Sequence, residues 1–303
     1  MSQSLSTKRR PLFTYHRQAA LMLLPYVLGL VVLVLLPTIA ALPLAFTSYN
    51  AIQSPVYIGL DNFRELIDDP LFELALKNSL VFMVIASPLR LVGALAFALL
   101  LRRPGCGVGA SRAAVYLPTV VPDVAWALVW LWILNPLFGP LNQLLGVFGI
   151  PSVAWGVETW PARFAIILLI AWQLGEGFVL CLAALQDIPK ELDEQAAVDG
   201  SGPLQHFATI TLPLIAPLLL IFLMRDTILT LQSNFVPALI VTRGGPNYAT
   251  TYLPLYIYTN AFDFLRFGYA AAMTTVLIGI TAAVLFIQYR IATRWKMGFA
   301  RDD

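Results

Sequence analysis

Charge is what this chain lacks most. Asp, Glu, Lys and Arg together make up 12% of its 303 residues, whereas soluble proteins carry about twice that share. Apolar residues reach 59%, and the mean hydropathy is +0.77. The apolar residues gather in runs of about 20 or more, the length that a helix needs to cross a bilayer. These features exclude a soluble globular domain and predict an all-α protein that is integral to a membrane.

Residues that build catalytic or metal sites are also scarce. The two cysteines, Cys106 in a short polar loop and Cys181 in an apolar run, are not expected to form a disulfide, and no metal-ligand spacing occurs. His16 and His206 stand alone, and we expect both on the surface. The chain has no G-x-x-x-x-G-K-[ST] phosphate loop and no nucleophile, base and acid at usable spacing. We therefore expect neither an enzyme nor ATP hydrolysis by this chain.

Six apolar runs predict six membrane-spanning helices. They lie near residues 19–46, 76–101, 112–134, 161–185, 208–233 and 268–290. The first run is longer than the apolar core of about 7–15 residues in a secretory signal peptide, so we interpret it as an uncleaved span. Lysine and arginine gather in the tails 1–18 and 291–303 and after the second run, which places both tails in the cytoplasm by the positive-inside rule.

Two loops on the opposite side carry features of their own. Residues 47–75 combine aspartates, a proline and amphipathic spacing, which predicts a short helix lying on the membrane surface. Residues 135–160 include Trp155 and Trp160, which we interpret as anchors at the membrane interface. A docking surface for an external partner is the alternative interpretation of these tryptophans.

The loop at residues 186–207 has the most specific sequence. Asp187 caps a helix that starts at Pro189 and runs about three turns. Gly200 supplies the left-handed conformation that ends this helix, and Pro203 starts a second helix that runs into the fifth span. These signals predict a short, stiff helix that projects into the cytoplasm crosswise to the spans. An ordinary interhelical turn has the same order of helix, glycine and helix.

The sequence of this loop and of its flanking residues is similar to a motif of a known protein family. The segment Glu194-Gln195-Ala196-Ala197-Val198-Asp199-Gly200, followed by Leu212-Pro213, resembles the cytoplasmic EAA loop of the permeases of binding-protein-dependent ABC importers. Gln195 stands where that family commonly has alanine, so the contact at this position is open. Over roughly residues 20–295, further motifs resemble the carbohydrate-uptake branch of maltose-type, oligosaccharide and glycerol-phosphate permeases. They include residues 59–63, 242–246 and 268–272.

The resemblance implies a division of labour among subunits. Residues 19–290 would form the transmembrane domain of an importer in the inner membrane of a prokaryote. The loop would contact a separate ATPase, which binds ATP and magnesium, through Glu194, Ala196, Ala197, Asp199 and Gly200. The implied partners are a second related permease, two ATPase subunits, an extracytoplasmic solute-binding protein and membrane lipid, with no nucleic acid and no cofactor in this chain. The implied substrate is a sugar or oligosaccharide, or alternatively glycerol phosphate or its diesters.

Ionisable residues interrupt the predicted spans. A charged side chain that faces lipid costs several kcal/mol, so each of these residues is expected to face protein or a water-filled cavity. They are Arg90, Asp123, Glu176, Arg225 and Asp226. One interpretation is that Arg90 or Arg225 pairs with an acid on a neighbouring helix. Arg225 and Asp226 are adjacent and point in different directions from their helix, so they need not pair with each other.

Glu176 is the most suggestive of the five. It lies between Gly175 and Gly177, which weaken a helix and open backbone groups toward a cavity. In maltose-type relatives, this region and part of the fifth span contact the sugar, and carrying that over selects Trp172, Gln173, Glu176, Leu231 and Asn234. Amides and carboxylates hydrogen-bond hydroxyls, and an aromatic face covers the apolar surface of a sugar. A secondary transporter driven by an ion gradient is the alternative from another class, although the inverted repeats common in such carriers are not visible.

Overall fold

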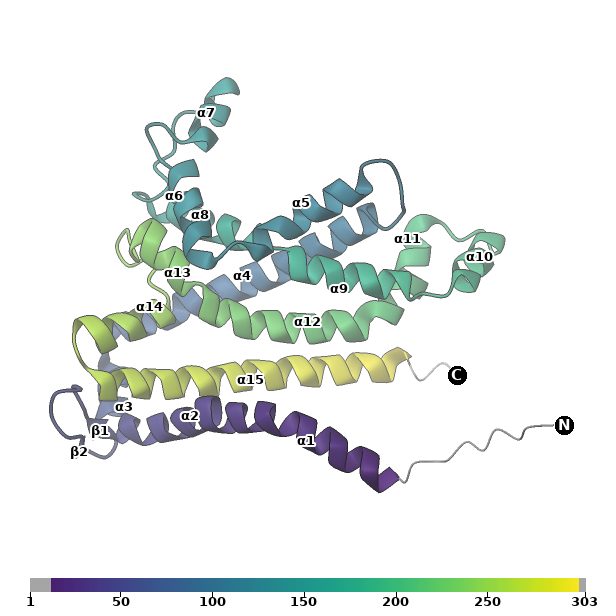
Figure 1. Cartoon of the computed structure of the whole chain (residues 1–303). Helices are drawn as coiled ribbons and strands as arrows, with labels where there is room; N and C mark the ends of the chain where they lie inside the picture. The colour runs from purple at the N-terminus through teal and green to yellow at the C-terminus, as the bar shows by residue number, and fades with distance from the viewer. Residues whose placement is uncertain (1–11, 300–303) are drawn as a thin grey trace.

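The structure, a computed structural model, describes residues 12–299. Helices form most of it, and the long helices run side by side (Figure 1). The α-helices are α1 (Leu12–Leu30), α2 (Leu36–Ala41), α3 (Asp61–Asp68), α4 (Pro70–Leu100), α5 (Val108–Val120), α6 (Asp123–Ile133), α7 (Pro140–Val147), α8 (Thr159–Ala171), α9 (Gly175–Gln186), α10 (Lys190–Val198), α11 (Pro203–His206), α12 (Leu212–Ser233), α13 (Phe235–Pro237), α14 (Leu253–Tyr258) and α15 (Phe267–Phe299).

Short 3₁₀- and π-helical segments extend or join these helices. They are η1 (Val31–Leu35), η2 (Leu42–Phe46), η3 (Phe207–Thr211), η4 (Ala238–Thr242) and η5 (Thr259–Asp263). The strands β1 (Thr47–Ser48) and β2 (Val56–Tyr57) pair antiparallel in a small hairpin. The short helix predicted within residues 47–75 is α3, which directly follows this hairpin. The prediction of a helical protein is therefore confirmed, with the hairpin as an addition.

Four helices are long and apolar enough to cross a membrane: Gln18–Phe46, Pro70–Leu100, Pro203–Thr242 and Phe267–Thr293. Two pairs of shorter helices, α5 with α6 and α8 with α9, meet the same criteria only when each pair is taken together. Residues 12–299 thus hold four candidate spans, or up to six if each bent pair is one span. The predicted tail 1–18 ends inside α1, and the predicted tail 291–303 starts inside α15. The outer parts of the two tails, 1–11 and 300–303, lie outside the described residues.

The helix predicted over residues 112–134 is not continuous. α5 and α6 meet at 105°. Val121, which precedes Pro122, has an extended ψ of 129°, because a proline ring disfavours helical geometry in the residue before it. Asp123 lies in the first turn of α6, where the helix dipole stabilises a carboxylate. The proline and aspartate therefore mark the end of one helix and the beginning of the next.

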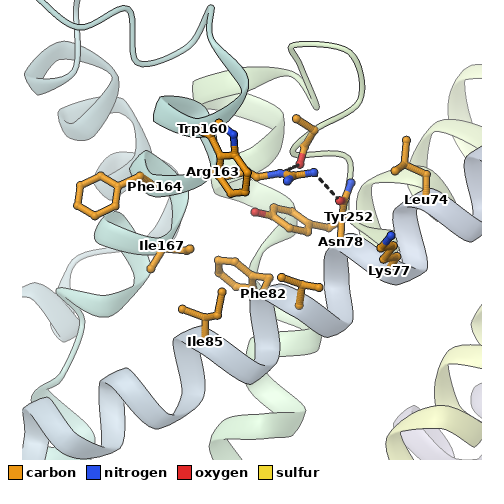
Figure 2. A pocket seen from close by; sticks show the side chains of 12 residues that line it. Leu74, Lys77, Asn78, Phe82, Ile85, Trp160, Arg163, Phe164, Ile167 and Tyr252 are labelled. Atoms are coloured by element: carbon orange, nitrogen blue, oxygen red, sulfur yellow. Dashed lines mark hydrogen bonds between the residues drawn. The ribbon is translucent and has the colours of Figure 1, made fainter.

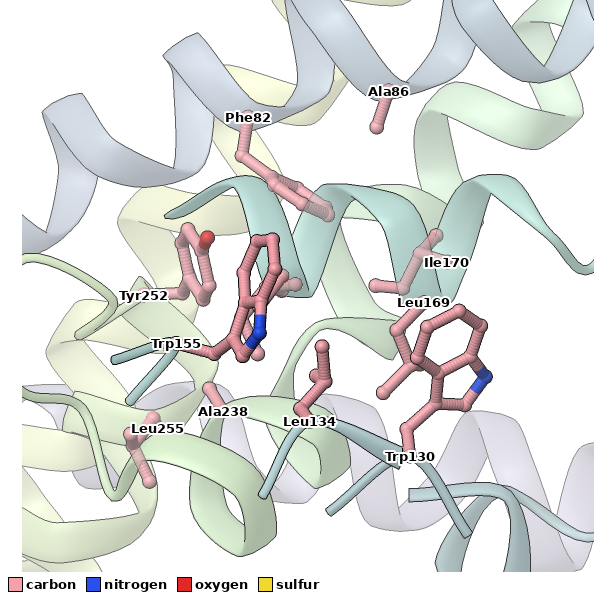
Figure 3. Close-up of a cluster of buried hydrophobic side chains, with 12 residues drawn as sticks. Phe82, Ala86, Trp130, Leu134, Trp155, Leu169, Ile170, Ala238, Tyr252 and Leu255 are labelled. Atoms are coloured by element: carbon pink, nitrogen blue, oxygen red, sulfur yellow. The ribbon is translucent and has the colours of Figure 1, made fainter. Parts of the chain in front are cut away.

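α4 packs against α8, α9, α12 and α14. Ala86, Ala94 and Ala98 on this helix are fully buried, and small side chains let membrane helices approach closely. One apolar cluster joins Ala94 to Phe178 of α9 and to α12. A second cluster, drawn in Figure 3, gathers Phe82 of α4 with apolar side chains of α6, α8 and the segment that begins α14. Both clusters include side chains of α4, so α4 is the helix against which α8, α9 and α12 are positioned.

Trp155 belongs to the second cluster (Figure 3). Only 8% of it is exposed, and its indole Nε1–H donates a 2.9 Å hydrogen bond to Oδ1 of Asn142. The prediction that Trp155 is an interfacial anchor is therefore wrong, because the fold packs the indole among buried apolar side chains of the second cluster. Trp160, by contrast, is 75% exposed, as an interfacial tryptophan would be.

The first candidate span contacts the other helices mainly near its end, where Ala45 packs with Tyr269 and Met273 of α15. None of its most apolar window is buried within the chain, and side chains such as Leu33 are 75% exposed. In Figure 1, α1 diverges from α15 toward its beginning. The surroundings of this helix are therefore supplied by something other than the described part of the chain.

Asp69 ties the beginning of α4 to two helices near the end of the chain. Its carboxylate accepts hydrogen bonds from the hydroxyls of Tyr256 (2.7 Å) and Tyr269 (2.6 Å) and from the backbone N–H groups of Leu71 and Phe72. Burial acts to raise the pKa of Asp69, but these hydrogen bonds favour the ionised form and hold the pKa below its usual value.

Candidate coupling helix and polar cluster of the membrane helices

α10 lies at the same end of the molecule as the beginning of α1 and the end of α15 (Figure 1). It ends at Val198. Gly200, two residues further on, has a φ of +69°, and the backbone N–H of Ser201 donates to the carbonyl of Ala196 at 2.9 Å. This is the usual closure of a helix by a left-handed glycine. α11 then begins at Pro203. The predicted order of helix, left-handed glycine and proline-started helix is confirmed.

Asp193 connects α10 to two other parts of the chain. Its carboxylate forms an ion pair with Arg102, just after α4, and lies 2.9 Å from Nε2 of His206 in α11. The side chain of His206 is 19% exposed, so the expectation of an isolated surface histidine is wrong. Arg102 and Asp193 are 91 residues apart, and no local pattern relates them. Sequence analysis therefore missed this contact.

The predicted coupling residues do not share one face. Glu194 and Asp199 are exposed, whereas Ala196 is only 5% exposed and packs within the loop itself. Ala197 lies in the last turn of α10. The loop presents two aliphatic side chains that the sequence analysis did not select, Val198 (88% exposed) and Leu204 (84% exposed). Their apolar character inside a polar loop was the signal that could have identified them.

Two ion pairs lie among the candidate membrane helices. Nη1 of Arg90 in α4 is 2.6 Å from Oδ1 of Asp226 in α12, and both side chains are nearly or fully buried. Nη1 of Arg225 in α12 is 2.5 Å from Oε2 of Glu176 in α9. Pairing of these arginines with acids on neighbouring helices is therefore confirmed. Arg225 and Asp226 take partners on different helices, as their directions along α12 predicted.

The second pair differs from the first in its exposure. The side chains of Arg225 and Glu176 are 46% and 41% exposed, whereas those of Arg90 and Asp226 are 11% and 0% exposed. A half-exposed ion pair in a membrane helix is stable next to water or another protein and unstable next to lipid. The buried pair also has a structural role, because Nη2 of Arg90 donates to the carbonyl of Gln173 at 2.9 Å. That carbonyl lies just beyond the end of α8.

α8 and α9 bend by 46° at the residues between them, where a weakened helix was predicted. The flanking glycines are also required by packing. A Cβ on Gly175 would lie 2.4 Å from Oγ1 of Thr119, and one on Gly177 would lie 2.3 Å from Cζ of Phe222. Since real side chains do not approach so closely, these glycines allow α9 to contact α5 and α12.

The five predicted pathway residues fall into two groups. Trp172, Gln173 and Glu176 lie together at the bend, and Trp172 is 57% exposed. Leu231 and Asn234 lie inside the bundle, 1% and 0% exposed. Within the described residues, neither the amide oxygen nor the amide nitrogen of Asn234 has a hydrogen-bond partner. The structure therefore does not bring the second group to the surface that carries Trp172.

Asp123 departs from what was expected of an ionisable residue in a span. It is exposed, and in the described part of the chain it forms no ion pair. The bend between α5 and α6 is the reason, because it places the carboxylate at the free end of a helix instead of inside one. Pairing within the chain, one interpretation of the ionisable residues in the spans, is therefore not found for Asp123 among residues 12–299.

Long apolar helices, and ion pairs between them, indicate an integral membrane protein built of helices. Residues 91–297 match the family of binding-protein-dependent transport system inner membrane components, and the chain belongs to that family. It is therefore an ABC transporter permease, the membrane-spanning transport subunit of such a system.

Individual relatives agree with the family. The chain is 34% identical over 276 residues to the probable ABC transporter permease protein YesP of Bacillus subtilis (strain 168), with 89% of each chain covered. It is 31% identical to the sulfoquinovosyl glycerol transport system permease protein SmoG of Agrobacterium fabrum, over 90% of this chain and 89% of the relative. Its fold resembles a chain of the bacterial alginate ABC transporter, solved in complex with an alginate pentasaccharide-bound periplasmic protein. The TM-score is 0.77 at 24% identity, with 94% of this chain and 98% of that chain covered.

Proposed function

We propose that this chain and a second, related permease form the path for ATP-driven uptake of a sugar or oligosaccharide. Family membership supports the importer, and carbohydrate transport by relatives supports the substrate class: one relative carries the name of a sulfoquinovosyl glycerol system, and the similar fold comes from an alginate transporter. The motifs of the carbohydrate-uptake branch along residues 20–295 point the same way.

In the proposed topology each bent helix pair is one span, so that six spans cross the inner membrane. Both ends of the chain and α10 then lie in the cytoplasm. Two observations support this arrangement. The beginning of α1, the end of α15 and α10 occupy one end of the molecule (Figure 1). Arginine and lysine concentrate in the tails 1–18 and 291–303 and after α4, as the positive-inside rule requires.

α10 is proposed to dock on a separate ATPase subunit, which binds ATP and magnesium. Glu194, Asp199 and the left-handed Gly200 set the polar part and the direction of the docking surface. Val198 and Leu204 add an exposed apolar part, whereas Ala196 supports the loop from within. Two ATPase subunits require two such loops, so a second permease completes the complex. A solute-binding protein delivers the substrate on the other side, as in the complex described for the alginate transporter.

The observation that carries the proposed path is the half-exposed pair of Glu176 and Arg225 beside the bend. Charged groups cannot face lipid at this depth without large cost, so this surface is proposed to line a water-filled path. Trp172 lies one turn away and offers an aromatic face to a sugar ring. Among residues 12–299 the buried amide of Asn234 has no hydrogen-bond partner, and it is proposed to bind a substrate hydroxyl.

Glycerol phosphate or its diesters remain a second candidate substrate, favoured by one observation. The side chain of Arg225 is 46% exposed although its guanidinium pairs with Glu176, and guanidinium groups bind phosphate through paired hydrogen bonds. Uptake of a sugar and uptake of a phosphorylated glycerol both fit the same path. Identification of the ligand that the extracytoplasmic binding protein retains on purification distinguishes them.

The test of the proposed function is uptake by the purified assembly in proteoliposomes. We expect uptake to require ATP, and we expect the chain to co-purify with a soluble ATPase and one other permease. Uptake by the isolated chain driven by an ion gradient would identify a secondary transporter instead. A stable, transport-competent complex with two copies of this chain and no second permease would contradict the heteromeric arrangement alone.

A further inference from the structure

A cavity of about 340 Å³ lies between the first half of α4 and the first half of α8 (Figure 2). Ala249 and Tyr252, just before α14, close its far side. The volume falls at the lower end of the range of about 300–1,000 Å³ that is usual for ligand sites. The cavity is remote from α10, and its lining includes none of the predicted pathway residues. It is therefore separate from the coupling helix and from the bend.

The lining of this cavity is polar at one end and apolar at the other. Lys77 and Arg163 supply two cations near the beginnings of α4 and α8, whereas Ile85 and Ile167 lie further along the same helices (Figure 2). Lys77 and Ile85 are eight residues apart on α4, which corresponds to about 12 Å along the helix axis. A ligand that fits both ends has a charged head and an apolar body.

The cationic end is built to receive an anion. Arg163 is held in place, because Nε donates to the carbonyl of Ala249 and Nη2 donates to Oδ1 of Asn78, each at 3.2 Å. Its guanidinium lies 5.4 Å from the ring centre of Trp160. Lys77 forms no ion pair with any residue in 12–299. None of the described residues that line the cavity is acidic, so the two positive charges have no counter-ion here.

The side chains at the apolar end of the cavity are exposed on the outer surface of the helices. Val81, Ile85 and Phe164 are 51%, 45% and 54% exposed, and α4 is itself a candidate membrane span. Trp160, 75% exposed beside Arg163, is typical of the level where a membrane meets water. The cationic end therefore lies at the depth of lipid headgroups, and the apolar end lies at the depth of acyl chains.

We propose that this cavity binds a phospholipid with an anionic headgroup. The headgroup phosphate contacts Lys77 and Arg163, and one acyl chain lies against Val81, Ile85 and Phe164. A sugar does not suit the site, because the apolar end offers its hydroxyls no hydrogen-bond partner. A helix of another subunit would need an acidic side chain at the level of Lys77 to neutralise the same charges.

The test uses the intact permease assembly, purified in mild detergent. It is exposed to an equimolar mixture of palmitoyl-oleoyl phosphatidylglycerol and palmitoyl-oleoyl phosphatidylcholine, and retained lipid is measured by native mass spectrometry. We expect preferential retention of phosphatidylglycerol. Lys77→Gln should reduce that preference about fivefold, the usual effect of one basic residue on anionic lipid. Ile85→Trp should reduce retention by filling the apolar end without a change of charge.

Each variant has a matched control. Arg64→Gln removes a 76% exposed arginine from α3, next to the beginning of α4, and should leave the preference unchanged. Val92→Trp places the same ring on α4 at a 63% exposed position outside the cavity and should leave retention unchanged. Equal retention of the two lipids, or equal effects of Lys77→Gln and Arg64→Gln, would overturn the proposal. A photoreactive group at position 85 that captures another subunit instead of lipid would overturn it as well.

Discussion

Replacement of Gly200 by valine should separate the transport chain from its ATPase without preventing membrane insertion. Gly200 has φ +69°, and a Cβ built there meets no atom within 4 Å. The β-carbon of valine therefore introduces no clash, and we expect the effect to come from the left-handed backbone. That conformation costs an ordinary L-residue about 1–2 kcal/mol, and more for a β-branched one. A change of this size shifts the balance between a correctly aimed and a displaced α10 by about 5- to 30-fold.

The same loop offers a matched control. Gly202 has φ −67° and ψ 161°, an extended conformation open to any residue, and its Cβ would also meet no atom within 4 Å. Gly202→Val therefore adds the same side chain without strain. Gly200→Asn should fall between the two, because asparagine adopts the left-handed region more readily than valine.

The assay has three readings for each variant: the amount of chain in the membrane, the amount of ATPase that co-purifies, and uptake in proteoliposomes. We expect Gly200→Val to reach the membrane in the same amount as the unmodified chain. Its co-purified ATPase and its uptake should each fall at least about fivefold. Gly202→Val should match the unmodified chain in all three. If the two valine variants behave alike, the left-handed end of α10 is not what aims the coupling helix.

Three further predictions concern side chains elsewhere. Asp193→Asn weakens the contacts of α10 with Arg102 and His206. Because the side chains of Asp193 and Arg102 are 33% and 28% exposed, we expect these contacts to lose about 1 kcal/mol of their stabilising free energy, and uptake to fall roughly fivefold at unchanged membrane levels. Asn234→Leu and Glu176→Leu remove hydrogen-bonding groups worth about 0.5–1.5 kcal/mol when neutral and 1.5–3 kcal/mol when charged, so uptake should fall roughly 3- to 100-fold while ATPase association is kept. Because the folded chain lowers the pKa of Asp69, its stabilising contribution is present above the ordinary value of about 3.9 and is lost as the pH falls through the lowered value. The thermal unfolding temperature of Asp69→Asn should therefore depend less on pH below about 4.

These predictions have their own controls and contrary outcomes. Glu191→Gln removes an exposed acid from the same helix as Asp193 and should leave uptake unchanged; equal losses in the two variants would mean that the contacts of Asp193 do not position α10. A well-expressed Glu176→Leu complex with full uptake would show that this site is neither path nor scaffold, whereas poor expression would assign it to folding. An identical pH dependence with and without the Asp69 carboxylate would exclude Asp69 as the titrating group.

Local sequence patterns predicted the structure correctly where a single residue or a single apolar run decides the backbone conformation. Runs of apolar residues predicted the long helices, because a bilayer requires about 20 such residues in succession. Gly200 and Pro203 predicted the break between α10 and α11, because backbone preference is a property of the single residue. The order of the motifs along the sequence also indicated the permease family, and the match over residues 91–297 shows that the chain belongs to it.

Other predictions failed where the path of the backbone between elements mattered. The helix over 112–134 was expected to be continuous, although Pro122 and Asp123 end one helix and begin another at 105°. Trp155 was expected at the membrane interface, yet the fold buries it against Asn142. In both cases the prediction used the residue type alone, whereas the outcome depended on the direction of the backbone before and after that residue.

The sequence by itself determined where the apolar helices and the left-handed break lie, and which charged residues fall between them. Only the tertiary structure decided which of those charges meet. Glu176 joins Arg225 and Arg90 joins Asp226 across different helices. The physical reason is that an almost uniformly apolar helix carries little information about which face turns inward. The choice is made by close packing, as where Gly177 admits the ring of Phe222, and that packing depends on residues far apart in the chain.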